Sequence, residues 1–142
     1  MERIKINLPE NFSFSTSISI RITDLNYGGH VGNDSFLSLI HEARQQFLHH
    51  HGYSELDFAG VGLIMADVAI EYKKELSYGE NVIISVKANG FDKLGFDLFY
   101  KLEVKADQNT VLAGKAKTGM ICFDYNLKKK VSLPEEAIQK LS

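Results

Sequence analysis

The stretch NDSFLSLIHEARQQFLHHH, residues 33–51, carries the only long helical pattern in this chain of 142 residues. Its apolar side chains recur at the three- and four-residue spacing of one helix face, at Phe36, Leu39, Ile40, Ala43 and Phe47. Asn33 is a suitable N-cap, and Asp34 puts a carboxylate in the first turn, where the helix dipole favours it. Gly52 is suited to end the helix. The sequence therefore predicts one amphipathic helix over residues 33–51.

Strand patterns lie on both sides of this helix. Residues 12–22 alternate between apolar and polar side chains, which is the period of a strand with one buried face. Four more strands are predicted after the helix, over residues 63–73, 81–89, 96–106 and 111–123. The third of these alternates, and its apolar face is formed by Phe96, Leu98, Tyr100, Leu102 and Val104. The short turns between these strands imply antiparallel pairing. A short terminal helix is predicted from Pro134.

This element order predicts an α+β domain in which the helix covers one face of an antiparallel sheet of about five strands. Apolar residues also occur at the opposite register, for example Tyr72, Ile83 and Phe99. A single helix cannot cover both faces of the sheet. A second subunit is therefore expected to bury part of the remaining apolar surface.

Length and composition narrow the class of protein. The chain is long enough for one domain, residues 1–142, with its own core. A net charge of −2 disfavours nucleic acid as a partner, and Cys122 alone can form neither a disulfide nor a zinc cluster. No apolar run approaches the ~20 residues that cross a bilayer, and the N-terminus lacks the apolar core of a signal peptide. We expect a cytoplasmic protein with no membrane partner and no metal.

The loop DLNYGGHVGND, residues 24–34, joins the first predicted strand to the helix and follows no period. It contains an imidazole (His30), two carboxylates (Asp24 and Asp34) and a carboxamide (Asn26). The first N–H groups of a helix have no partner inside the helix, and with the helix dipole they can polarise a carbonyl whose oxygen becomes negative. These side chains and helix N–H groups are the kinds of groups that an acyl-transfer or hydrolytic site uses.

The loop and the helix together read Asp24-x-Asn26-x-x-Gly29-His30-Val31-Gly32-Asn33, followed by Glu42-Ala43-Arg44. This run resembles the active-site loop of hotdog-fold thioesterases of the 4-hydroxybenzoyl-CoA thioesterase-like family, which typically reads Asp-x-Asp-x-x-Gly-His-Val-Asn-Asn before a Glu-Ala-Arg. The segments IEYKKELSYGE (70–80) and VSLPEE (131–136) are also similar to family segments. The resemblance covers roughly residues 14–140.

The resemblance implies a fold and an assembly. In the family, the sheet wraps around the central helix, and two subunits join their sheets edge to edge. Dimers often pair into tetramers, so a homodimer or a homotetramer is expected here. The family's active site lies at the dimer interface, with the thioester carbonyl at the N-terminus of the central helix.

The resemblance also implies roles for particular residues. The backbone N–H groups of Gly32, Asn33 and Asp34 would stabilise the oxyanion. Lys74 and Lys93 would lie near the phosphates of coenzyme A, which is part of the substrate, so no separate cofactor is expected. Glu42 is a secondary catalytic candidate because it belongs to the matched motif.

One position departs from the family pattern, because Asn26 stands where the usual catalytic Asp would be. A carboxamide can act neither as a nucleophile nor as a general base. His30, Asp24 and Asp34 are the alternative bases, and His30 is favoured because an imidazole ordinarily titrates near neutral pH. Structural roles stay open beside these: a turn residue for Asn26, a loop-fixing acceptor for Asp24 and a helix-dipole partner for Asp34.

Two functions follow from this pattern. The first is a hydrolase that cleaves an acyl-CoA or acyl carrier protein thioester to a free acid and a thiol. The second, motivated by Asn26, is a thioester-binding module with little or no turnover. The three histidines at 49–51 do not change this choice, because consecutive helical side chains point about 100° apart and cannot share one metal ion.

Overall fold

The computed structural model describes residues 1–142. The chain forms six strands, two α-helices and one turn of 3₁₀ helix at Ile22–Asp24. The strands and helices follow the order β1 (Phe14–Ser19), α1 (Asn33–His50), β2 (Gly62–Tyr72), β3 (Asn81–Asn89), β4 (Gly95–Ala106), β5 (Asn109–Asp124), β6 (Lys129–Lys130) and α2 (Glu135–Leu141).

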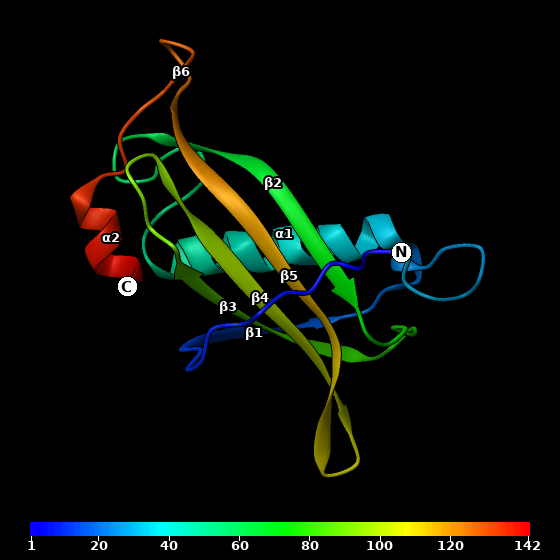
Figure 1. The fold of residues 1–142 in the computed structure, drawn as a ribbon. Helices are drawn as coiled ribbons and strands as arrows, with labels where there is room; N and C mark the ends of the chain where they lie inside the picture. Colours follow the sequence, from blue (N-terminus) through cyan, green and yellow to red (C-terminus); the bar gives the residue numbers. More distant parts are fainter.

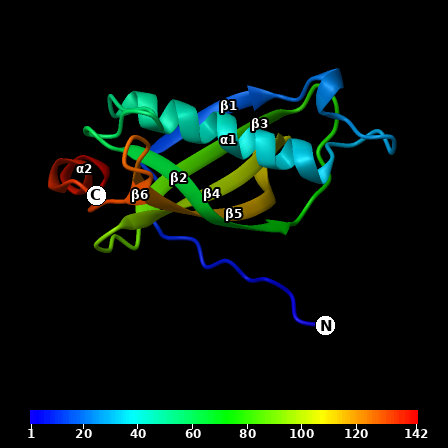
Figure 2. The ribbon, with the colours of Figure 1, turned by 90° about the horizontal axis from the view of Figure 1, so that it is seen from above.

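The strands form one antiparallel sheet in the order β1-β3-β4-β5-β2, with the two-residue β6 paired to β5. Helix α1 lies along one face of this sheet (Figures 1 and 2). The predicted α+β arrangement of five long strands and one long helix is confirmed. Strand β2 lies at one edge of the sheet and β1 at the other.

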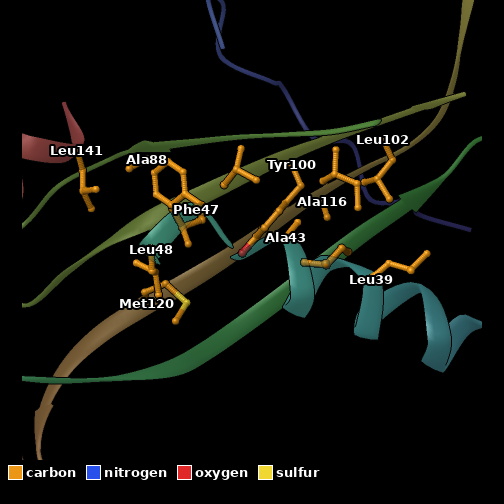
Figure 3. Close-up of a cluster of buried hydrophobic side chains, with 14 of the residues drawn as sticks. Leu39, Ala43, Phe47, Leu48, Ala88, Tyr100, Leu102, Ala116, Met120 and Leu141 are labelled. Carbon is orange, nitrogen blue, oxygen red and sulfur yellow. The ribbon is translucent and has the colours of Figure 1, made fainter. Parts of the chain in front are cut away.

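The core lies between α1 and the sheet. The predicted apolar stripe of α1 is buried throughout, and so is the predicted inner face of β4, formed by Phe96, Leu98, Tyr100, Leu102 and Val104. Figure 3 shows Leu39, Ala43 and Phe47 of α1 beside Tyr100 and Leu102. Burying each large apolar side chain contributes about 1.5–3 kcal/mol, so this interface fixes α1 on the sheet.

The N-terminal segment, residues 1–13, crosses the face of the sheet opposite α1 (Figure 2). The Ile6 N–H donates to a Glu71 carboxylate oxygen at 2.8 Å, and Lys115 Nζ donates to the Ile6 carbonyl at 3.3 Å. Farther along, Lys87 Nζ donates to the Glu10 carbonyl at 2.6 Å. The chain therefore covers part of its outer sheet face with its own N-terminus.

The first strand is shorter than its alternating pattern predicts. It ends at Ser19, and Ile22 is 67% exposed in the 3₁₀ turn that follows. This turn forms because the Asp24 carboxylate accepts the Arg21 N–H at 2.8 Å, three residues before it. No helix of the structure is both long and apolar enough to cross a membrane.

Candidate active site

The loop before α1 is closed by its own backbone. The Asn26 N–H donates to the His30 carbonyl at 2.8 Å, and the Gly29 N–H donates to the Asn26 carbonyl at 3.1 Å. Gly29 has φ +81°, a conformation that a residue with a Cβ rarely adopts. Leu25 and Val31 pair as an isolated antiparallel bridge at the base of the loop. The position of His30 is therefore fixed by the backbone hydrogen bonds around it.

Two backbone donors are free at the start of α1. The Gly32 N–H donates to the Asp24 carbonyl at 3.3 Å, and the Ser35 N–H donates to Oδ1 of Asp34 at 2.9 Å. The structure provides no acceptor for the N–H groups of Asn33 and Asp34. Of the three predicted oxyanion donors, Asn33 and Asp34 are thus available and Gly32 is already occupied.

A cleft of about 450 Å³ opens beside these donors. The cleft lies between the loop and the segment that follows β2. A hydrogen bond joins these two walls, because the Val31 N–H donates to the Leu76 carbonyl at 2.9 Å. The lining residues of the cleft are Asn26, Tyr27, Gly28, His30, Val31, Asn33, Phe36, Tyr72, Lys73, Lys74, Glu75 and Leu76. The cleft therefore brings together the predicted residues Asn26, His30, Asn33 and Lys74.

The lining residues that were not predicted as part of the site include Phe36, Tyr72 and Glu75. The rings of Phe36 and Tyr72 meet edge to face, with their centroids 5.0 Å apart. Burial, with a smaller effect of the Asp34 charge, raises the pKa of Tyr72. Nε2 of His30 lies 3.3 Å from a carboxylate oxygen of Glu75.

Asn26 combines a turn role with a place in the cleft. Its Oδ1 accepts the Gly28 N–H at 2.9 Å, which is the hydrogen bond of an Asx turn. A Cβ at Gly32 would come within 3.4 Å of Asn26 Cβ and 3.7 Å of its Nδ2. These are ordinary van der Waals contacts, which place Asn26 next to the start of α1, whereas the tight contact of such a Cβ would be with Oδ1 of Asp34, at 2.7 Å.

The predicted carboxylates lie elsewhere. Asp24 is buried, and its carboxylate accepts the Arg21 N–H and lies 3.3 Å from the Arg21 guanidinium. Asp34 is exposed at the helix start and binds its own first turn. Glu42 accepts a hydrogen bond from Gln46 at 3.0 Å and lines, with Asp24, a separate hollow between β1 and α1. None of the three lines the cleft that holds His30.

The two predicted lysines are far apart within one subunit. Lys74 lines the cleft, and its Nζ lies 3.4 Å from a Glu80 carboxylate oxygen. Lys93 lies in the turn between β3 and β4, where its carbonyl accepts the Leu133 N–H just before α2. In Figure 1, α2 and the loop before α1 are at opposite ends of the molecule. The structure therefore does not bring Lys93 to the cleft of its own subunit.

The arginine of the Glu-Ala-Arg motif is a core residue of this subunit. Arg44 Nε donates to a Glu55 carboxylate oxygen at 2.6 Å, and its NH1 donates to the Tyr100 hydroxyl at 3.4 Å. That hydroxyl is 2.8 Å from Oγ1 of Thr118. The buried network links α1 to the sheet and to the segment after the helix.

Comparison with known proteins identifies relatives along most of the chain. The family model of the thioesterase-like superfamily matches residues 20–141. A 1,4-dihydroxy-2-naphthoyl-CoA hydrolase from Nostoc punctiforme is 24% identical over 132 residues, which cover 91% of this chain and 86% of that protein. The enzyme of the same name from Microcystis aeruginosa is 27% identical over 119 residues, covering 82% and 83% of the two chains.

Solved structures share the fold at low sequence identity. A thioesterase-superfamily protein from Jannaschia has a TM-score of 0.82 and 17% identity, with 94% of this chain and 83% of that chain covered. A mutant of 4-hydroxybenzoyl-CoA thioesterase in complex with 4-hydroxybenzoyl-CoA has a TM-score of 0.84 and 13% identity, with 93% and 100% covered. The arrangement of a curved sheet around α1 is therefore one that thioesterases use.

Proposed function

Since the chain belongs to the thioesterase-like superfamily and has the hotdog fold, we propose that it hydrolyses acyl-coenzyme A thioesters to a free acid and a thiol. The observation that carries this proposal is the cleft that His30 lines together with Asn33, whose N–H group is free at the start of α1. The curated relatives named above are hydrolases. The alternative, a binding module with little turnover, is therefore not favoured.

The geometry supports separate roles for the backbone N–H groups at the start of α1 and for the side chains of His30 and Asn26. The thioester carbonyl oxygen would point at the N–H groups of Asn33 and Asp34, which stabilise the negative charge that develops on it. Losing one such donor typically costs about 2.7–4 kcal/mol in the transition state. His30 would activate the attacking water, and the Asn26 amide would help to position it. Water and these groups suffice for hydrolysis, so we propose no cofactor.

Coenzyme A is the thiol carrier we propose. The relatives described above are named for coenzyme A thioesters, and an acyl carrier protein substrate finds no support among them. Lys74 is the proposed contact to a coenzyme A phosphate, because it lies in the wall of the cleft. Lys93 could contribute only from another subunit.

An aromatic acyl group is the finer substrate class we propose. The edge-to-face pair of Phe36 and Tyr72 lines the cleft, and Tyr72 is half exposed to solvent. Aromatic side chains favour offset or edge contacts with a further ring. The acyl groups in the names of the curated relatives and of the 4-hydroxybenzoyl-CoA complex are also aromatic.

We further propose that the chain acts as a homodimer joined through β2. This strand is 11 residues long and lies at the edge of the sheet, with Met65 and Val68 about 40% exposed. A long apolar edge strand is a template for pairing with another chain. Size-exclusion chromatography coupled to light scattering measures the mass of the assembly. We expect a dimer for the parent protein and a monomer for Val68→Asp, and a monomeric parent protein would contradict the proposed dimer. The tetramer and the cytoplasmic location stay predictions.

The test of function is thiol release from a panel of acyl-CoAs by the purified protein. We expect turnover with benzoyl-type thioesters to exceed turnover with straight-chain acyl-CoAs of similar size. His30→Ala should abolish most of it, and Asn26→Ala should lower it. A preparation that binds aryl-CoA analogues but releases no thiol from any substrate would overturn hydrolysis in favour of the binding module.

A further inference from the structure

Glu75 is the one acidic side chain that faces the imidazole of His30. Its carboxylate oxygen lies 3.3 Å from Nε2 of His30, and both residues line the cleft. Resting on the function proposed above, we propose that Glu75 is a positioning residue that makes His30 the general base of hydrolysis. It does so by accepting a hydrogen bond from the Nε2–H group, which keeps the proton on Nε2 and leaves the lone pair on Nδ1.

The backbone holds these two residues side by side. His30 precedes Val31, whose N–H donates to the carbonyl of Leu76 at 2.9 Å, and Leu76 directly follows Glu75. Leu76 is buried in the core, so this hydrogen bond connects the loop to a fixed point. On the other side, the Lys74 N–H donates to the Ala113 carbonyl at 3.1 Å. The pair is therefore held by the fold, although both side chains reach solvent.

The lysines near Glu75 pair with other carboxylates, so the Glu75 carboxylate is available to His30. Lys73 Nζ lies 2.6 Å from a carboxylate oxygen of Glu71, and Lys74 Nζ lies 3.4 Å from a carboxylate oxygen of Glu80. Each lysine in the cleft thus pairs with a carboxylate other than that of Glu75. The only ionisable side chain within ion-pair distance of the Glu75 carboxylate is His30.

No other side chain around the cleft serves equally well as the base. Asn26 has no basic group, and Asp24 is buried against Arg21 outside the cleft. Asp34 uses Oδ1 to bind the Ser35 N–H and does not line the cleft. A carboxylate that binds one imidazole nitrogen fixes the tautomer and stabilises the imidazolium that forms, as in other hydrolytic sites.

The reaction balances with these groups alone. A water oxygen bonds to the thioester carbon while one water proton passes to Nδ1 of His30. The tetrahedral intermediate then breaks its C–S bond, and the leaving sulfur takes that proton from the imidazolium. The products are the acid and the thiol, and His30 returns to its neutral form.

The kinetic test compares Glu75→Gln and Glu75→Asp with the parent protein on the best aryl-CoA of the panel. Glu75→Gln is expected to lower kcat about tenfold to a hundredfold, with KM changed less than about twofold, because the carboxylate acts mainly in the transition state. Glu75→Asp should recover part of kcat. In the His30→Ala background, Glu75→Gln should have no further effect, since the two residues act as a unit. Glu135→Gln on α2 is the matched control, expected to leave kcat unchanged.

A second measurement does not depend on turnover. The ¹⁵N NMR shifts of the His30 ring, assigned by comparison with His30→Ala, report which nitrogen carries the proton. We expect the proton on Nε2 in the parent protein and a shift toward a mixed population in Glu75→Gln. Unchanged ring shifts and unchanged kcat in Glu75→Gln, with His30→Ala inactive, would overturn the role of Glu75 and leave the hydrolase intact. If the parent protein releases no thiol at all, the proposed function falls and the role of Glu75 falls with it.

Discussion

Replacing Glu55 with alanine would leave the guanidinium of Arg44 buried without its carboxylate. The Arg44 side chain is 6% exposed, and its Nε–Oε1 contact with Glu55 measures 2.6 Å. Removing one partner of a buried ion pair typically costs 3–5 kcal/mol, because the remaining charge keeps its desolvation penalty. Glu55 is itself 27% exposed, so water can partly replace it. We therefore expect the free energy of unfolding to fall by about 3 kcal/mol, the lower end of that range.

For a chain of this length, 1 kcal/mol corresponds to roughly 3 °C in Tm, so the loss should appear as about 10 °C. The assay is thermal unfolding followed by circular dichroism at one protein concentration, because association also shifts Tm. The double variant Arg44→Met/Glu55→Ala should be more stable than Glu55→Ala alone, since it removes the stranded charge. Neither residue lines the cleft, so kcat at 25 °C should stay within about twofold of the parent value.

A Glu55→Ala protein whose Tm lies within 3 °C of the parent would refute this reasoning. The reasoning would also be refuted if the double variant Arg44→Met/Glu55→Ala had a lower Tm than Glu55→Ala alone. Either result would mean that solvent reaches Arg44 in the folded protein.

Three other substitutions have defined outcomes. Asn26→Asp should keep Tm within about 2 °C, because a carboxylate oxygen can still accept the hydrogen bond of the turn. It should raise kcat, because it adds a base beside the thioester. An unchanged kcat would show that this position takes no part in proton transfer. Burial lowers the pKa of His51 from 6.5, so the folded protein favours the neutral ring, and stability present above pH 6.5 is lost as the pH falls below it. His51→Gln should therefore reduce the drop in Tm between pH 7.5 and 5.5, and an equal drop in both proteins would contradict this. In Gly95→Ala, the new Cβ of β4 would overlap the Met120 carbonyl oxygen of β5. We therefore expect the free energy of unfolding to fall by more than about 4 kcal/mol, with little soluble protein. Normal expression with an unchanged Tm would show that the two strands can separate at this point.

The regular elements could be predicted because their periods report local geometry. The stripe from Phe36 to Phe47 and the alternation along residues 96–104 each describe one face of one element, and both faces are buried as expected. The pattern at residues 12–22 continued past the true end of β1. There the side chain of Asp24 closes a turn, and a local hydrogen bond of this kind overrides periodicity.

The site was harder to predict because its members meet only in three dimensions. His30 and Asn26, which both line the cleft, could be grouped from the sequence because they belong to one continuous loop. Glu75 gains its place from a hydrogen bond between Val31 and Leu76, two residues that no local pattern connects. Arg44 lies off the apolar stripe of α1, so its burial depends on Glu55, a partner in the segment that follows the helix.

The N-terminal segment over the outer face of the sheet has a practical consequence for experiments. Residues before β1 contribute a buried side chain, Ile6, and four hydrogen bonds to the sheet. A truncation that starts at β1 would therefore remove packing and hydrogen bonds from the outer face of the sheet. The C-terminal residue Ser142 follows a short surface helix, and its side chain is exposed. A tag placed there leaves the outer face sealed, and proteins for the assays above are best made in that form.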